Sequence, residues 1–579
     1  MSEQGYWQRR TTRRQTLRGA ALGGLGMAAF LAGCSGSNNN KSKGASTTTS
    51  APSGGNATSA PATQAALPTL TVRPTAAVDE SKINKNNVYR DRQSQPWPTI
   101  NPYKDLITGL TLGFTIYDHM WYTTKDTNER VLFLATGIEQ PDPLHFTVKI
   151  GKAVFHDKPP TSGRAVTAAD IKASYEAAAK SKTISNSDWW TKTLDTITTP
   201  DDSTVSFTLK QPDAWTFTST NAGSPLSGSI IPQEIATQPD FMDKDLIGSG
   251  RYQWVSHENG ANPKMKRFDK WRVAGEPWTG GYEQKLIQEQ AAADAAFAAQ
   301  QIDHLAAQNK AEKDQLVSQL GKQVDVDTTV TGAIWTVETR ADGAFADPRV
   351  RQAIYLGLNR DEYIQLLELG NGVKSGPIPP GFKTFALDND ELTKTFWQFD
   401  PAQGKQLLQA AGFDLSHEYE IKYYILTDKP AQFAQIVQGQ LQKNLGMKVK
   451  LTAEDFGTWL AKSLYQGQYD GFIIYPTLDY DDPSSYIGAY GKVIGGRPNW
   501  AGFKDDELDQ AVAAQKLEFD DGKRTAMLKD IQRKAYQKFA PFIPLYVAFS
   551  NDLFWSYVKG RLVGRGSYGL FNGRLYIDK

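Results

Sequence analysis

The feature that most constrains the fold is a strand–helix–strand pattern in the second half of the chain. Residues 419–426 (YEIKYYIL) read as a strand, residues 431–446 as an amphipathic helix, and residues 447–456 as a second strand. Units of this kind build parallel sheets, because the connecting helix covers a face of the sheet. The pattern therefore predicts an α/β fold with mixed sheets.

Other segments extend this prediction along the chain. The stretches HFTVKI (145–150) and TVSFTLK (204–210) alternate like half-buried strands, long helices are expected from 505 to about 539, and 540–549 is strand-like. Helix ends are marked by N-cap residues, by proline at the first helical position and by a closing glycine. These signals lie at Thr167 with Asp170, Asp347 with Pro348, Asn359 with Glu362, Asp400 with Pro401, and Gly412.

Residues 1–33 resemble an export signal. The basic segment TRRQTLR (12–18) precedes a short apolar run and then LAGC (31–34). This order is typical of a secretory signal, and the apolar run is shorter than the roughly 20 residues that span a membrane. The pair Arg13–Arg14 resembles a twin-arginine signal, and LAGC resembles a bacterial lipobox, which implies a lipid on Cys34.

Residues 34–66 are predicted to be a disordered tether. After Cys34 they contain no large apolar residue, so they cannot bury enough surface to offset chain entropy. A lipid, a tether and a large body predict a protein anchored on the outer face of the cytoplasmic membrane, extracellular or periplasmic. The same arrangement excludes an integral channel.

Composition excludes further classes of function. The net charge is +1, but residues 1–33 hold five arginines and one glutamate, so the remainder is slightly acidic and a nucleic-acid partner is not expected. Cys34 is the only cysteine, which excludes internal disulfides and cysteine-based metal clusters. The six histidines are scattered and form no H-E-x-x-H motif. We therefore predict no metal and no cofactor.

The stretch GFIIYPTLDYDDPSSY (471–486) runs an apolar strand into a group of acids. Asp479, Asp481 and Asp482 lie within four residues of one another. Ligands of α/β sheets bind beyond the carboxyl ends of strands, so this loop is well placed for a site. The acids lack the spacing of a calcium loop. A solvated turn is expected for Asp481 and Asp482 and remains an alternative for Asp479.

Several motifs, in unbroken order over about residues 98–579, together resemble the family 5 solute-binding proteins of bacterial ABC importers. They are FTVKIGKAVFHDKPPTSGRAVTAADIKASYEAA (146–178), GSGRYQW (248–254), DPRVRQAIYLGLNRDEYI (347–364), DPAQGKQLLQAAGF (400–413) and APFIPLY (540–546). The resemblance implies two lobes joined by a hinge that close over a ligand.

By these motifs, the first lobe would span residues 67–335 plus 545–579, with an extra subdomain at about 114–222. The second lobe would span 336–544, with chain crossings near 332–340 and 540–547. The resemblance further implies a monomeric receptor that performs no chemistry and hands its ligand to an ABC permease in the membrane. A sensory or chaperone role stays open.

In peptide-binding members of that family, the acidic loop supplies an aspartate that pairs with the N-terminal ammonium of the peptide, and PTLDYDDP places Asp479 in that position. Pro476 replaces the usual tryptophan and Tyr475 a small residue, so the pocket must be shaped differently. Ile473 and Leu464 stand where peptide binders often carry basic residues. Recognition of the peptide carboxylate is therefore absent or built elsewhere.

The ligand-binding residues predicted in this way come from four segments. Trp189 and Trp190 are candidates for stacking on the ligand, with core packing as the alternative, and the same ambiguity applies to Phe456. The segment PTINPY (98–103) matches one that lines the cleft. The full set is Asp479, Tyr475, Pro476, Thr477, Tyr480, Phe456, Trp189, Trp190 and Asn101.

Two other functions compete with a peptide receptor. An enzyme is disfavoured because the chain has no G-x-S-x-G, no P-loop and no dinucleotide fingerprint after a strand. An oligosaccharide receptor of the same family is the closer alternative, because the fourteen tryptophans offer platforms for sugars. Such a receptor has no need of an ammonium-pairing aspartate, so Asp479 favours peptides.

Overall fold

The computed structural model describes residues 80–123, 130–181, 189–217, 228–238, 240–477, 482–494, 497–561 and 574–579. All of them belong to one unit, residues 63–579. The predicted signal, the predicted lipidation site Cys34 and the predicted tether lie outside the described residues. Within the described ranges, no helix combines the length and the apolar character needed to cross a membrane.

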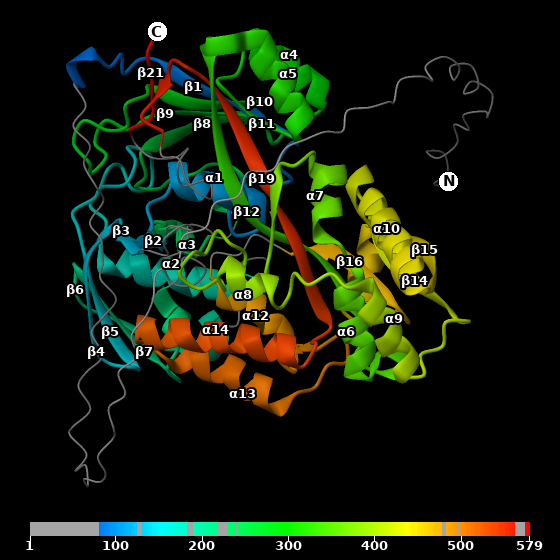
Figure 1. Ribbon diagram of the computed structural model, residues 1–579. Coiled ribbons are helices and arrows are strands. Elements are labelled where there is room, and N and C mark those ends of the chain that lie inside the picture. The colour runs from blue at the N-terminus through cyan, green and yellow to red at the C-terminus, as the bar shows by residue number, and fades with distance from the viewer. Residues whose placement is uncertain are drawn as a thin grey trace, which may run out of the picture. The chain divides into compact units, whose positions relative to one another are not determined.

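The first part of the chain builds two four-stranded sheets (Figure 1). One has the order β1-β10-β9-β8, with β1 parallel to β10 and the other pairs antiparallel. The other is antiparallel, in the order β4-β5-β7-β6, and lies within the predicted subdomain. The strands are β1 (Val88–Gln93), β4 (Ala135–Asp142), β5 (His145–Ile150), β6 (Leu194–Asp201), β7 (Thr204–Leu209), β8 (Tyr252–Glu258), β9 (Ala261–Arg267) and β10 (Gly281–Leu286).

The largest sheet has seven strands and mixed directions. Its order is β11-β19-β12-β16-β14-β15, and β13 also pairs with β19. The predicted strand–helix–strand unit is confirmed, because β14 runs parallel to β15 and α10 (Asp428–Gln440) connects them. The strands are β11 (His304–Ala307), β12 (Val324–Thr339), β13 (Gly372–Lys374), β14 (Glu418–Ile425), β15 (Lys448–Asp455), β16 (Phe472–Pro476) and β19 (Phe542–Trp555).

Two long antiparallel strands, β12 and β19, stand out in the ribbon (Figure 1), and each contributes residues to more than one hydrophobic core. Val324 and Leu553 belong to the core that also contains the two four-stranded sheets. Ile334 and Val547 belong to a second core, which is built mainly from the residues between β12 and β19 in the sequence. The register shifts between these points, where Val330 pairs with Phe549 and the next paired residue is Ile334. Among the described strands of the large sheet, β12 and β19 alone therefore contribute both to the core of the first two sheets and to the cores of the later part of the chain.

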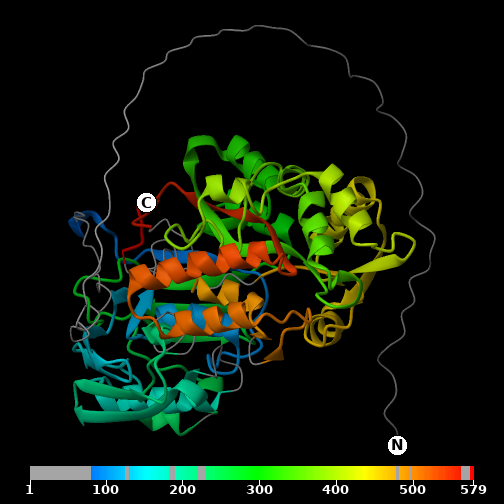
Figure 2. The ribbon, with the colours of Figure 1, turned by 60° about the horizontal axis from the view of Figure 1, so that its bottom comes forward.

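The helices cover the sheets at the positions that the capping signals predict. Thr167 and Asp170 form a capping box, Asp347 accepts from the backbone N–H of Arg349, and Asp400 from that of Gln403. The main helices are α1 (Leu106–Thr115), α2 (Ala168–Lys180), α4 (Gln290–Ala298), α5 (Lys310–Leu320), α6 (Pro348–Gly357), α7 (Arg360–Glu368), α9 (Pro401–Ala410), α13 (Asp506–Ala514) and α14 (Asp521–Gln537). Helices α13 and α14 lie side by side in both views (Figures 1 and 2).

One predicted cap is wrong. Asn359 caps α7 by accepting from the N–H of Asp361, but the expected reciprocal bond from Glu362 is absent among the hydrogen bonds of the described residues. The backbone N–H of Asn359 donates to Gln440 instead (2.8 Å), and Gln440 donates to Glu362 (2.8 Å). A tertiary contact from α10 has replaced the local capping box.

Candidate functional site

The acidic loop follows the end of β16, a strand in the middle of the seven-stranded sheet. Strand β16 pairs with β12 on one side and β14 on the other, and Phe472, Ile473 and Ile474 are fully buried. Asp479 and Tyr480 lie outside the described residues, which resume at Asp482. What the structure describes is therefore the frame that holds both ends of this loop.

The strand end of the loop is fixed by buried polar contacts. The hydroxyl of Tyr475 donates to the carboxyl of Glu338 on β12, and the indole N–H of Trp500 donates to the same oxygen (3.1 Å). Thr477 exchanges two hydrogen bonds with Ile334, both 2.9 Å, through its backbone N–H and its hydroxyl oxygen. Pro476 lies opposite Trp335 in the ladder. The chain therefore enters the loop in one orientation.

The far end of the loop contradicts one prediction. Asp482 is not in a solvated turn: its side chain is fully buried, and its Oδ1 lies 3.0 Å from Nη2 of Arg524 on α14. The same oxygen accepts from the backbone N–H of Ser484 (2.9 Å) and from its hydroxyl. The turn-forming role of aspartate is kept, but burial of its charge requires a cation, and α14 supplies it.

Arg524 also contacts a turn that packs against the first part of the chain, the part that builds the two four-stranded sheets. Its Nε donates to Gln515 (3.3 Å) in the short turn η10 (Gln515–Leu517). That turn packs against η3 (Ala214–Phe217), which follows the β4–β7 sheet. One arginine thus connects the acidic loop with a contact between the second part of the chain and the first.

The predicted aromatic residues fall into different environments. Phe456 is 41% exposed and forms a group with Tyr424 and Trp459, at ring distances of 5.3 and 6.1 Å. Trp459 in turn meets Tyr475 edge-on at 5.9 Å. The structure thus brings Phe456 and the β16 end together. Sequence reasoning missed Trp459, Glu338 and Trp500, because no local signal marks their proximity to the loop.

Two of the predicted residues of the first part, Trp189 and Asn101, are buried. Trp189 is 3% exposed and its indole N–H donates to Thr216 in η3 (3.1 Å). The side chain of Trp190 lies outside what the structure describes. Asn101 is 1% exposed; its Oδ1 accepts from the N–H of Tyr103 (3.0 Å) and its Nδ2 donates to Asp243 (3.2 Å). Their roles toward a ligand stay predictions.

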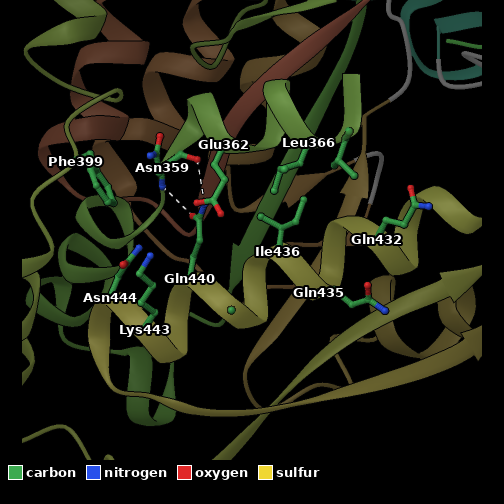
Figure 3. A pocket seen from close by; sticks show the side chains of 12 residues that line it. Asn359, Glu362, Leu366, Phe399, Gln432, Gln435, Ile436, Gln440, Lys443 and Asn444 are labelled. Atoms are coloured by element: carbon green, nitrogen blue, oxygen red, sulfur yellow. Dashed lines mark hydrogen bonds between the residues drawn. The ribbon is translucent and has the colours of Figure 1, made fainter. Parts of the chain in front are cut away.

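A separate groove of about 630 Å³ lies between α7 and α10 (Figure 3). Gln440 on α10 forms hydrogen bonds with Asn359 and Glu362 on the opposite side of the groove. Leu366 and Ile436 also line the groove. None of its described lining residues is among the predicted ligand-binding residues. No group of described histidine, aspartate or glutamate side chains has the arrangement of a metal site.

The comparison with protein families decides between a binding protein and an enzyme. Residues 130–495, more than half of the chain, match the family described as bacterial extracellular solute-binding proteins, family 5. The chain belongs to this family. Because the family is one of solute-binding proteins, the prediction that the chain is not an enzyme is confirmed.

Curated relatives of this family 5 protein match it over part of their length. A di/tripeptide-binding protein of Pseudomonas aeruginosa is 28% identical over 35% of this chain and 37% of the relative. A glutathione-binding protein of Pectobacterium atrosepticum is 25% identical over 55% of this chain and 59% of the relative. The chain therefore spans between about a third and three-fifths of these relatives.

The fold also matches solved structures. The periplasmic binding protein DppA of Helicobacter pylori, solved with the peptide STSA, superposes with a TM-score of 0.69 at 21% identity. The match covers 87% of this chain and all of that one. The predicted α/β fold of the periplasmic-binding-protein type is confirmed.

Replacing Glu338 by glutamine is expected to remove a pH dependence of stability. Burial raises the pKa of Glu338 to about 7, although hydrogen bonds from Tyr475 and Trp500 lower it in part. The ordinary value is 4.5, so the folded state favours the protonated acid. The stabilisation from protonated Glu338 is fully present below about pH 4.5. It is lost as the pH rises through 7, which lowers the free energy of unfolding by about 3 kcal/mol.

Thermal unfolding at pH 4.5, 6 and 7.5 checks this prediction. The wild type should lose stability across the series relative to Glu338→Gln. The exposed Glu418→Gln on β14 is the matched control for loss of one negative charge. Parallel curves for wild type and Glu338→Gln would contradict the prediction.

Proposed function

We propose that this family 5 protein is the lipid-anchored, substrate-binding component of an ABC importer and captures short peptides for delivery to a permease. The proposal is supported by membership of a solute-binding family and by relatives named for di- and tripeptides and for glutathione, itself a tripeptide. The observation that carries it is the frame around the acidic loop: β16 and Arg524 hold both ends of the segment that contains Asp479.

In this proposal Asp479 pairs with the N-terminal ammonium of the peptide. A carboxylate in a closed site gains from a cation and is costly when left alone, so ligand binding favours closure. The pocket beside it is formed by Tyr475, Pro476, Thr477 and Tyr480, with Phe456 at its edge. Trp189, Trp190 and Asn101 complete the site from the first lobe.

Closure in this proposal is a hinge motion of β12 and β19. These strands pass from the first core to the others, and the register shift between Val330 and Ile334 lies in the stretch between. Hinges are a few residues that absorb backbone change between rigid bodies. The first lobe would be residues 67–335 plus 545–579, the second 336–544.

The lipid on Cys34 and the twin-arginine-like signal place the receptor, in this proposal, on the outer face of the cytoplasmic membrane. The tether of residues 34–66 lets a monomeric body reach a permease nearby.

Mass spectrometry of what co-purifies with the full-length protein tests the function directly. The mass of the native complex is measured first, and the ligand is then released by denaturation and its own mass is measured. Short peptides are the expected result and give the ligand length. An oligosaccharide would overturn the peptide assignment and favour the aromatic group of Phe456, Tyr424 and Trp459 as a sugar platform. An intact mass of the mature chain that lacks a diacylglycerol on Cys34 would contradict the anchor.

A further inference from the structure

The aromatic group of Tyr424, Phe456 and Trp459 lies at the edge of the large sheet from which the acidic loop starts. Strand β14 runs parallel to both β15 and β16. Its register pairs Ile425, the last residue of β14, with Asp455, the last residue of β15. The carboxyl ends of three neighbouring parallel strands therefore meet at one edge, which is where ligands of α/β sheets bind.

The rings of the aromatic group run from a hydrophobic core to the surface. Trp459 is 2% exposed and belongs to the same core as Tyr475, which it meets edge-on. Tyr424 is half-buried, packs against that core, and has its ring 4.9 Å from that of Trp459. The ring of Phe456 stacks on that of Trp459 at an interplanar angle of 19°. The exposed ring thus rests on buried ones, and packing holds it in place.

A capped turn presents Phe456 at this edge. The side chain of Asp455 accepts a hydrogen bond from the backbone N–H of Thr458 (3.0 Å), which caps the turn α11 (Phe456–Thr458). This turn continues directly into the helical segment η8 (Trp459–Leu464). The backbone of Phe456 is therefore set by a strand on one side and by a helical segment on the other.

Several large apolar side chains are exposed together at this edge. Phe456 is 41% exposed, Ile425 is 62% exposed and Leu426 is 68% exposed. Ile425 lies close to Phe456, because it pairs with the residue that precedes Phe456 in the chain. Single exposed apolar side chains are normal on a protein surface, but neighbouring ones mark a place that a ligand or a partner covers. The edge therefore offers an accessible surface to an apolar group.

The distance from the acidic loop favours a side chain of the bound ligand as the group that covers this surface. Ring-to-ring distances of 5.9 and 6.1 Å lead from Tyr475, at the start of the loop, through Trp459 to Phe456. An extended tripeptide is about 10 Å long. A peptide held at the loop by its ammonium group therefore has side chains within reach of Phe456. The side chains of Phe456 and Ile425 have no hydrogen-bonding atoms, so they suit an apolar group and not the hydroxyl groups of a sugar.

We propose that Phe456 and Ile425, supported by the rest of the aromatic group, form a subsite for a large apolar side chain of the peptide. The receptor then prefers peptides that carry such a side chain, because contact with Phe456 removes apolar surface of both partners from water. Phe456 is thus a specificity-determining residue, whereas Asp479 provides a contact that every peptide with a free N-terminus makes. The proposal rests on the proposed peptide-binding function.

Calorimetric titration of the full-length protein with variants of trialanine tests this proposal. Each of the three positions in turn carries leucine or asparagine, which have nearly the same shape but differ in polarity. At one position or more, the wild type should bind the leucine peptide about tenfold more tightly than the asparagine peptide, as expected for partial burial of an apolar side chain. In Phe456→Ala this preference should fall to about twofold or less, since most of the contact surface is removed.

Two further variants show whether the effect comes from apolar surface at this place. Phe399→Ala is the matched control, because Phe399 is 46% exposed and lines the separate groove between α7 and α10 (Figure 3). It removes the same ring from a similar exposure and should keep the leucine preference. Phe456→Leu keeps apolar surface without the ring and should keep most of the preference. Binding of trialanine itself by each variant shows that the variant is folded.

Equal binding of the leucine and asparagine peptides by the wild type at all three positions would overturn the subsite while leaving peptide binding intact. A leucine preference that survives in Phe456→Ala would place the apolar contact elsewhere and overturn it as well. A preference lost in Phe456→Leu as completely as in Phe456→Ala would show that the ring face is required, as for a sugar platform, and would contradict a subsite for apolar side chains. Failure of all the peptides to bind the wild type would instead refute the proposed function.

Discussion

Replacing Asp479 by asparagine is expected to weaken the binding of a short peptide by about 100-fold or more, since removing one partner of a buried charge pair costs about 3–5 kcal/mol. Asparagine keeps the size of the side chain and the turn, so the loss reports the charge. Calorimetric titration with a peptide that carries a free N-terminus measures the effect.

Two controls separate the charge pair from a change in the loop. Asp521→Asn, on the exposed first turn of α14, removes the same charge elsewhere and should bind normally. An N-acetylated peptide should bind the wild type and Asp479→Asn equally weakly, because it lacks the ammonium. If Asp479→Asn binds the free peptide as tightly as the wild type does, Asp479 is only a turn residue.

Replacing His304 by asparagine is expected to destabilise the protein by about 3–5 kcal/mol, the cost of breaking a buried charge pair. The ring of His304 on β11 lies 3.0 Å from Asp91 on β1 and 3.0 Å from Asp552 on β19. It therefore ties the first sheet to the end of a strand that enters the other cores. Asparagine leaves the buried carboxylate of Asp91 and the partly buried carboxylate of Asp552 without their cation.

The same site predicts a pH dependence. Burial by itself lowers the pKa of His304, but Asp91 and Asp552 outweigh burial and raise it to about 10. The ordinary value is 6.5, so the stabilisation is fully present below about pH 6.5 and is lost as the pH rises through 10. The loss amounts to about 5 kcal/mol.

Urea unfolding of wild type and His304→Asn at pH 6, 8 and 10 measures both effects. The difference between the two proteins should be largest at pH 6 and shrink toward pH 10. His417→Asn, on a half-exposed ring 3.4 Å from Asp470, is the matched control and should change stability little. A difference that stays constant with pH would contradict the charged state of His304.

Local signals predicted the elements well because they act over a few residues. Thr167 with Asp170 and Asp400 with Pro401 form the expected caps, and β14, α10 and β15 follow the expected pattern. The prediction for Asn359 and Glu362 was wrong because Gln440, 81 residues away from Asn359, offers competing hydrogen bonds. A capping box is worth about 1 kcal/mol, so one tertiary contact of similar strength displaces it.

The candidate site was predictable only in part, for a related reason. The loop that contains Asp479 was recognisable from its acids and from the strand before it. The burial of Asp482 depends on Arg524, 42 residues later, and the support of Tyr475 depends on Glu338, 137 residues earlier. Long-range partners of this kind leave no periodicity in the sequence, because they are set by how strands and helices pack.

The sequence by itself determined the fold class, the order of the elements and the resemblance to family 5 solute-binding proteins. It also identified the acidic loop whose Asp479 is predicted to pair with the ammonium group of a ligand. Those properties follow from hydrophobic periodicity, caps and motif order, which are encoded over short distances. Only the tertiary structure decided which charges are buried together: Asp482 with Arg524, His304 between Asp91 and Asp552, and Asp118 with Arg272. The physical reason is that a buried charge is stable only beside a partner, and packing alone brings distant partners together.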